Sequence, residues 1–169
     1  SNKGSMHDGL TKEEGLPEGD FSDVDSLVSF TGNASAEELI AGAHDWIDLQ
    51  EFMDWFLLVH YSDSGDSAGK NSYLYNDPDN QGFHFAPWDF NHSWGQGWYT
   101  YRISSDTLHS FDGHNRVFWA IHSVPEANDE LWERFSSMRA DGPFGLDWIL
   151  GEVDAYYELD LKPWDHAAG

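Results

Sequence analysis

The longest apolar cluster of the chain, residues 55–59, limits its fold more than any other feature. Asp48 followed by Glu51 has the spacing of a helix cap, and apolar residues then recur at helical intervals over residues 49–60. Such a broad apolar face must pack against other elements, because burying it is what stabilises the helix. We therefore predict a helix over residues 49–60 that is the most buried helix of the chain.

Other helices are predicted on both sides of this segment. Ser35 and Glu38 have the spacing of a capping box, which marks a helix start. Downstream, helical patterns cover roughly residues 115–123, 125–138 and 146–159. Pro125 stands at the first turn of its segment, where the missing N–H is harmless.

A short hairpin is predicted between these helices. Residues 72–75 and 83–86 alternate as strands do, and residues 76–82 are rich in turn-forming types. Residues 1–25 show little periodicity and are expected to be irregular. The sequence therefore predicts an α+β fold, dominated by helices, with one small hairpin at about residues 72–88.

The charge of the chain excludes several classes of partner. Its 31 Asp and Glu against 8 Lys and Arg give a formal net charge of −23, which repels nucleic acid and anionic membrane surfaces. No run of about 18 apolar residues occurs, so we expect no membrane span. The chain has no Cys, which excludes disulfides and thiolate metal sites.

An acid, an amide and a second acid lie around the predicted hairpin. Asp66 precedes Asn71 by five residues, and Asp89 follows the second strand. A phosphoryl-transfer enzyme needs a carboxylate to deprotonate the acceptor hydroxyl and oxygen ligands for Mg²⁺, and this spacing suits both. The alternative is an ordinary polar loop, because Asp and Asn are common wherever chains turn.

The neighbouring residues resemble the CotH kinase family, a group of atypical protein kinases. The segments KNSYLYND and FHFAPWDFNHSWG carry the family's pattern of an Asn before an aromatic-Leu-Tyr strand, followed by Pro-Trp-Asp. The matching residues are Asn71, Tyr73, Leu74, Tyr75, Pro87, Trp88, Asp89, Asn91 and Gly95. The likeness covers about residues 45–165.

The resemblance implies a role for each residue of this pattern. Asp66 would be the catalytic base, unless a shift of register gives that role to Asp63. Asn71 and Asp89 would hold Mg²⁺ or Mn²⁺ and thereby ATP. Trp88 would pack under this site and fix Asp89, which we expect to be partly buried. Lys70 would approach a phosphate, although an exposed loop lysine is the alternative. The implied acceptor is a Ser or Thr hydroxyl of a protein.

The resemblance also implies a domain organisation. Residues 1–30 would be an irregular acidic lead-in between two lobes, and residues 31–169 would form a kinase-like C-terminal lobe as a single domain. The N-terminal lobe would be largely absent, so the chain alone would bind nucleotide weakly or be inactive. An extracellular or cell-envelope location follows from the acidic composition and the family.

Two other interpretations remain open. The chain would be a non-catalytic interaction module if its kinase lobe were degenerate. It would be a carbohydrate-binding domain if exposed tryptophans stacked on sugars, for which Trp94 and Trp98 are the candidates. The other tryptophans in predicted helices are expected in the core; they are Trp46, Trp55, Trp119, Trp132 and Trp148. His84 and His92 flank Asp89, but His84 is expected to face solvent, and we do not expect zinc.

Overall fold

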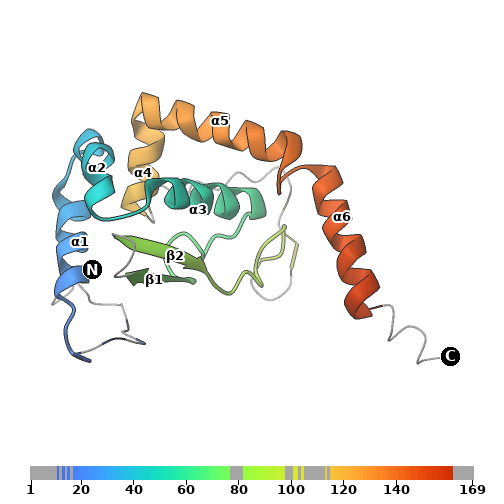
Figure 1. Ribbon diagram of the computed structural model, residues 1–169, viewed down its shortest axis with the longest axis horizontal. Helices are drawn as coiled ribbons and strands as arrows, with labels where there is room; N and C mark the ends of the chain where they lie inside the picture. Colours follow the sequence, from blue (N-terminus) through green and yellow to red (C-terminus); the bar gives the residue numbers. More distant parts are fainter. Residues whose placement is uncertain are drawn as a thin grey trace. The chain divides into compact units, whose positions relative to one another are not determined.

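The computed structural model describes residues 11, 13, 15, 17–76, 82–97, 101, 102, 104, 113 and 115–161 (Figure 1). In this part of the chain, six α-helices and one two-stranded antiparallel hairpin confirm the predicted helix-rich α+β class. The chain divides into two compact units, residues 1–128 and 129–169, which are described separately.

The elements follow the predicted order. The first unit contains α1 (Ser22–Asn33), α2 (Ala36–Gly42), the 3₁₀ turn η1 (Ala43–Asp45), α3 (Leu49–Ser62), β1 (Ser72–Asn76), β2 (Phe83–Pro87) and α4 (Arg116–Ser123). Helix α5 (Pro125–Asp141) begins in this unit and continues in the second, which also holds α6 (Leu146–Tyr156) and a π-helical turn at Tyr157–Leu161.

The predicted helix starts are present as side-chain caps. Ser35 and Glu38 form a complete capping box at α2, and the Asp48 side chain accepts the backbone N–H of Glu51 at α3. Asn115 caps α4 by accepting the N–H groups of Val117 and Phe118. These caps satisfy backbone donors that no helical carbonyl can reach.

The core of the first unit lies where α3 meets β2 and α4. Trp55 of α3 stacks on Phe85 of β2 with ring centroids 3.7 Å apart, and it meets Phe118 of α4 edge-on at 4.9 Å. The predicted apolar face of α3 is buried throughout, at Phe52, Met53, Phe56, Leu57 and Val59. This confirms that α3 is the central helix of the unit.

The hairpin has the predicted strands and a defined register. Tyr73 pairs with Ala86 and Tyr75 with His84, so the two strands align along their whole length. The turn residues 77–81 lie outside the described residues. Strand β1 is largely exposed, whereas Phe83, His84 and Phe85 of β2 are all buried. The two strands therefore have different surroundings: β2 faces the core and β1 faces outward.

Helix α1 corrects the prediction that the chain is irregular up to residue 30. Apolar residues Val24, Leu27 and Val28 stand at helical intervals in it, and Leu27 is its only buried residue. The Arg116 guanidinium donates to the carbonyl oxygens of Thr31 and Ala34, at the C-terminal end of α1. A contact from α4 therefore satisfies terminal carbonyls of α1, and no local pattern predicts such a contact.

The second unit has a smaller buried surface. Leu131 and Phe144 are buried in it, whereas α6 has no buried residue. Trp132 and Trp148 are exposed, which contradicts their expected place in the core; Trp55 fulfils that expectation. Helices α5 and α6 form where the helical pattern predicts them, but each buries fewer residues than α3 does.

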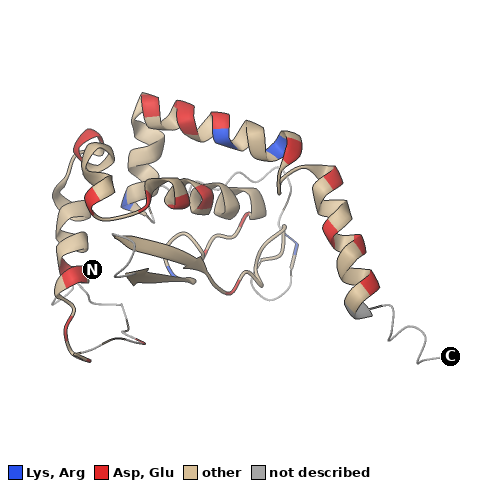
Figure 2. Ribbon diagram, viewed as in Figure 1, with Lys and Arg blue, Asp and Glu red and all other residues tan. Residues whose placement is uncertain are grey.

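The negative charge is spread over the helices. Figure 2 shows acidic residues on every described α-helix except α4. Within the described part of the chain, no helix combines the length and apolar character that crossing a bilayer requires.

Candidate functional site

The loop of residues 63–71 begins where α3 ends. Asp63 has a left-handed backbone with φ of 52°, and its N–H bonds back to the carbonyls of Val59 and His60. This stops the helix in the way that a C-cap usually does. The carbonyl of Asp66 then accepts the N–H groups of Lys70 at 2.9 Å and Asn71 at 3.2 Å. The segment from Asp66 to Asn71 therefore forms one hydrogen-bonded turn.

Buried contacts hold this loop from below. The Trp55 indole N–H donates to the carbonyl of Ser67 at 3.0 Å, and the Asn115 amide donates to the carbonyl of Ala68 at 3.1 Å. The hydroxyl groups of Ser64 and Ser67 bond to each other at 2.7 Å. Since Ser67 and Ala68 are fully buried, the loop forms part of the core surface and has a defined position.

Asp66 is paired with Lys70. The Lys70 ammonium lies 3.1 Å from Oδ1 of Asp66, whose side chain is 27% exposed, against 66% for Lys70. A pair this open to water contributes little to stability. The half-buried carboxylate is therefore held mainly by its backbone turn, and the lysine is the nearby positive charge.

Asn71 joins the loop to the segment that follows β2. Its side-chain amide donates to the backbone carbonyl of Asp89 at 3.1 Å, and its own carbonyl accepts the N–H of Trp88 at 3.2 Å. Together with the turn at Asp66, these bonds connect all three predicted site residues through Asn71. Asp66 and Asp89 are therefore both hydrogen-bonded to Asn71, at the end of the hairpin away from its turn.

Asp89 and Trp88 differ from what the sequence predicts. We expected Trp88 to pack beneath Asp89 and Asp89 to be partly buried, but Trp88 is 58% exposed and Asp89 is exposed. Because the Trp88 N–H continues the ladder toward Asn71, its ring lies against Tyr73 of β1 at 5.5 Å, edge-on. Asp89 itself has a left-handed backbone with φ of 55°. The site is therefore an open one.

The described acids of the site do not form a compact cluster of three carboxylates. Among the described His, Asp and Glu residues, the group close enough to share a metal is Asp48, Glu51 and His84, with ligand atoms within 4.8 Å of one another. A cation at Asp89 would accordingly need Asn71, water or phosphate to complete its ligands.

The group around Glu51 was missed by sequence reasoning. His84 was expected to face solvent, yet it is 5% exposed, with its Nδ1 atom 2.7 Å from a Glu51 carboxylate oxygen. The other oxygen of Glu51 accepts the backbone N–H of Phe85 at 3.0 Å. The sequence signal was Glu51 at the third helical position, where it was interpreted only as part of a cap.

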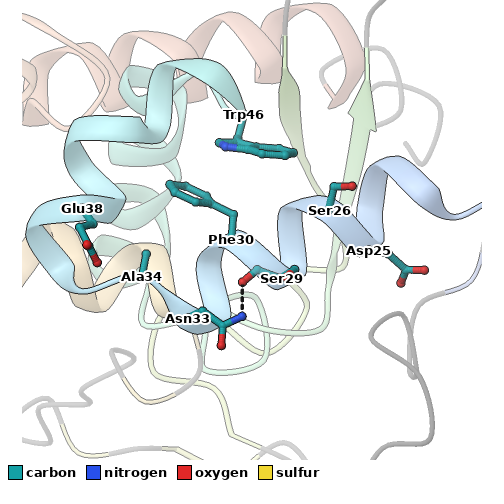
Figure 3. A pocket seen from close by; sticks show the side chains of 8 residues that line it. All are labelled: Asp25, Ser26, Ser29, Phe30, Asn33, Ala34, Glu38 and Trp46. Carbon is teal, nitrogen blue, oxygen red and sulfur yellow. Dashed lines mark hydrogen bonds between the residues drawn. The ribbon is translucent and has the colours of Figure 1, made fainter.

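An open groove of about 790 Å³ lies elsewhere in the first unit. Its lining residues are Asp25, Ser26, Ser29, Phe30, Asn33, Ala34, Glu38 and Trp46 (Figure 3). Phe30 and Trp46 stack with centroids 5.5 Å apart, and the Asn33 amide donates to the Ser29 carbonyl. None of the groove residues belongs to the Asp66, Asn71 and Asp89 set.

Comparison with known families gives one match. The family model described as CotH kinase protein matches residues 3–159, nearly the whole chain, and the chain therefore belongs to the CotH kinase family. No curated protein matches the chain.

Proposed function

Within the CotH kinase family, we propose that this chain transfers the γ-phosphoryl group of ATP to a Ser or Thr hydroxyl of a protein. One observation carries the proposal: Asn71 bonds to the Asp66 turn through its backbone and to Asp89 through its side chain. These bonds support a site in which one acid would serve proton transfer and the other would bind a metal, which are two needs of phosphoryl transfer.

The donor atoms fit Mg²⁺ or Mn²⁺. Because the amide nitrogen of Asn71 donates to Asp89, its amide oxygen is the atom left to bind a cation, together with the exposed Asp89 carboxylate. Hard oxygen ligands from one carboxylate and one amide suit Mg²⁺, which keeps several waters and binds substrate phosphates. When bound, the ion would neutralise charge on the phosphates.

Asp66 is the proposed general base. It would accept the proton of the attacking hydroxyl while the hydroxyl oxygen bonds to the γ-phosphorus. The bond from that phosphorus to the bridging oxygen would break, and ADP would leave with its electron pair. Lys70, 3.1 Å from Asp66, would place its positive charge beside the transferred group.

The rings of Tyr73 and Trp88 offer a surface for the nucleobase. Both are exposed and they meet edge-on; Tyr73 lies on β1, two residues after Asn71, and Trp88 lies between the end of β2 and Asp89. Stacking a planar base on such rings would bury area that is now open to water. This supports a nucleotide as the bound substrate and gives Trp88 a role that its exposure permits.

Phosphoryl transfer from γ-labelled ATP to a generic protein acceptor, with Mn²⁺ or Mg²⁺ present, tests the proposal. Asp66→Asn should lower the transfer rate by about 100-fold or more, because it removes the base, and should retain metal-dependent ATP binding. Asp89→Asn should lose both. Asp147→Asn, an exposed acid of α6, is the control of equal charge change.

Three results would contradict different parts of the proposal. Transfer by Asp66→Asn at the wild-type rate would show that another group acts as the base. Wild-type chain that binds Mn²⁺ and ATP without any transfer would instead favour the non-catalytic module. Binding of a glycan that is lost in Trp94→Ala would favour the carbohydrate-binding alternative, since Trp94 is 66% exposed.

An extracellular or cell-envelope location is part of the proposal. The net charge of −23 and the family membership support it. Fractionation of the producing cells, with detection of the native protein, would test it.

A further inference from the structure

Strand β2 has a second edge, opposite β1, that another part of the chain has to satisfy. Backbone N–H groups alternate between the two edges of a strand, so those of residues 83, 85 and 87 share one edge. Phe83 donates to the Trp46 carbonyl at 2.6 Å, and Phe85 donates to the Glu51 carboxylate at 3.0 Å. Pro87 has no N–H to satisfy.

The Glu51 side chain therefore accepts a strand N–H at a point where the neighbouring backbone has turned away from β2. Residues 46–48 run beside the start of β2, with a parallel bridge between Ile47 and Phe83. After Asp48 the chain coils into α3 and its backbone leaves the strand. The Glu51 side chain then reaches across and supplies the acceptor that a third strand would have supplied.

The second oxygen of Glu51 ties the same helix to the outer strand. It lies 2.7 Å from Nδ1 of His84, whose ring stacks on Tyr75 of β1 at 5.3 Å. Both oxygens of one carboxylate are thus committed to neighbouring residues of β2. Because His84 is buried, this contact is shielded from water and stronger than an exposed pair.

We propose that Glu51 is a positioning residue that sets the place of Asp89 relative to Asp66, a role that rests on the proposed function of these two acids. Glu51 holds the edge of β2 opposite β1 at Phe85, four residues before Asp89. Helix α3, which carries Glu51, runs directly into the loop that bears Asp66. One carboxylate thereby connects the two segments on which the site is built.

A metal centre formed by Asp48, Glu51 and His84 is the competing explanation. Their ligand atoms lie within 4.8 Å of one another. However, the two Glu51 oxygens already bind Phe85 and His84, and Asp48 caps α3 through the Glu51 N–H. These oxygen atoms already have hydrogen-bond partners in the protein, which favours a structural role over metal binding.

Hydrogen exchange at the Trp88 amide, measured by NMR without metal or nucleotide, tests the positioning role. This amide bonds to Asn71 at 3.2 Å and so reports whether the end of the hairpin is in place. In Glu51→Ala, Trp88 should exchange about tenfold faster relative to Val59, an amide of the α3 core. Glu51→Gln should exchange like wild type, because the amide oxygen can accept from Phe85 and the amide N–H can donate to Nδ1 of the His84 tautomer that carries its proton on Nε2.

Glu37→Ala is the matched control, because Glu37 is an exposed glutamate in the first turn of α2. It should leave the ratio of Trp88 to Val59 exchange unchanged. If Glu51→Ala only lowers the melting midpoint and leaves that ratio as in wild type, Glu51 stabilises the fold without positioning the hairpin. A melting midpoint raised by Zn²⁺ in wild type but not in His84→Ala would overturn the proposal in favour of the metal centre.

Binding of Mn²⁺ and ATP gives the functional readout at a temperature where all variants are folded. The Kd should rise about tenfold in Glu51→Ala and return to the wild-type value in Glu51→Gln. Equal Kd values for wild type and Glu51→Ala would contradict the positioning role. If wild type itself does not bind, the proposed function fails, while the exchange ratio still decides what Glu51 does to the hairpin.

Discussion

The two segments that carry the site are held in different ways. The loop of residues 63–71 rests on buried groups, with bonds from Trp55 and Asn115 to its carbonyls. The segment at Trp88 and Asp89 is exposed and joins the loop through Asn71. The loop of the proposed base, Asp66, is thus held by buried groups. The segment of the proposed metal ligand, Asp89, is held by a few hydrogen bonds at the surface.

This difference suits the two roles. A general base must meet a hydroxyl at a defined distance, which a buried loop secures. A metal ligand can be open to solvent, because Mg²⁺ usually keeps several water molecules in its coordination shell. Substitutions beneath the loop should therefore affect stability, and substitutions beside Asp89 should affect binding.

The largest effect is expected in the core, on helix α3. Phe56→Ala should lower the free energy of unfolding by about 3–5 kcal/mol, since it empties a buried site in α3. The Phe56 ring lies 4.0 Å from His60 and 5.1 Å from Phe118. Urea unfolding followed by tryptophan fluorescence measures the change, and Phe56→Leu should cost clearly less. An unchanged midpoint would show that α3 does not present this face to the core.

Asn115 allows the anchor of the loop to be measured separately from the cap of α4. Asn115→Ala should cost about 2 kcal/mol, because it removes both the cap and the bond to the Ala68 carbonyl. Asn115→Asp keeps the acceptor of the cap, replaces the donor by an oxygen atom and adds a negative charge, which a helix N-terminus accommodates. The difference between the two variants in urea unfolding gives the contribution of the cap, and equal losses would mean that the cap contributes nothing.

Asn71 should matter more for binding than for stability. Asn71→Ala removes one partly exposed hydrogen bond, to Asp89, and should cost about 1 kcal/mol. We expect Mn²⁺ with ATP to raise the melting temperature of wild type, and we expect Asn71→Ala to abolish most of that rise. Thermal melts with and without Mn²⁺ and ATP provide the test. A full metal-dependent rise in Asn71→Ala would exclude this amide from the metal site.

Trp88 should give the smallest change in stability. Because its ring is 58% exposed, Trp88→Ala should cost less than about 1 kcal/mol of unfolding free energy. Affinity for Mn²⁺ and ATP should nevertheless fall several-fold, through loss of the surface shared with Tyr73. Calorimetric titration and thermal melts of one sample test both statements. A stability loss like that of Phe56→Ala would restore the buried position predicted from the sequence.

Local features were predictable from the sequence. The caps at Ser35, Asp48 and Asn115 involve residues two or three positions apart, and the strands of the hairpin lie close together in the chain. The turn between Asp66 and Asn71 is equally local, although we interpreted its spacing as a sign of function. Such contacts leave a signal in the sequence, because their partners are close together in the chain.

The surroundings of single side chains were not predictable. His84 is buried because Glu51, 33 residues earlier, reaches it from the start of α3. Carbonyl groups at the C-terminal end of α1 accept hydrogen bonds from Arg116, more than 80 residues later. A large apolar side chain such as that of Trp88 suggests a core position. The hydrogen bond from its N–H to Asn71 instead places its ring against the exposed Tyr73 of β1.

The sequence by itself determined the helix-rich α+β class, the caps, the hairpin and the spacing of Asp66, Asn71 and Asp89. Only the tertiary structure decided that the Asp66 loop is anchored in the core, that Asp89 is open to solvent, and that Glu51 ties the helix to the hairpin. The reason is physical: periodicity and capping depend on neighbours along the chain, whereas burial depends on which distant surface packs against a residue.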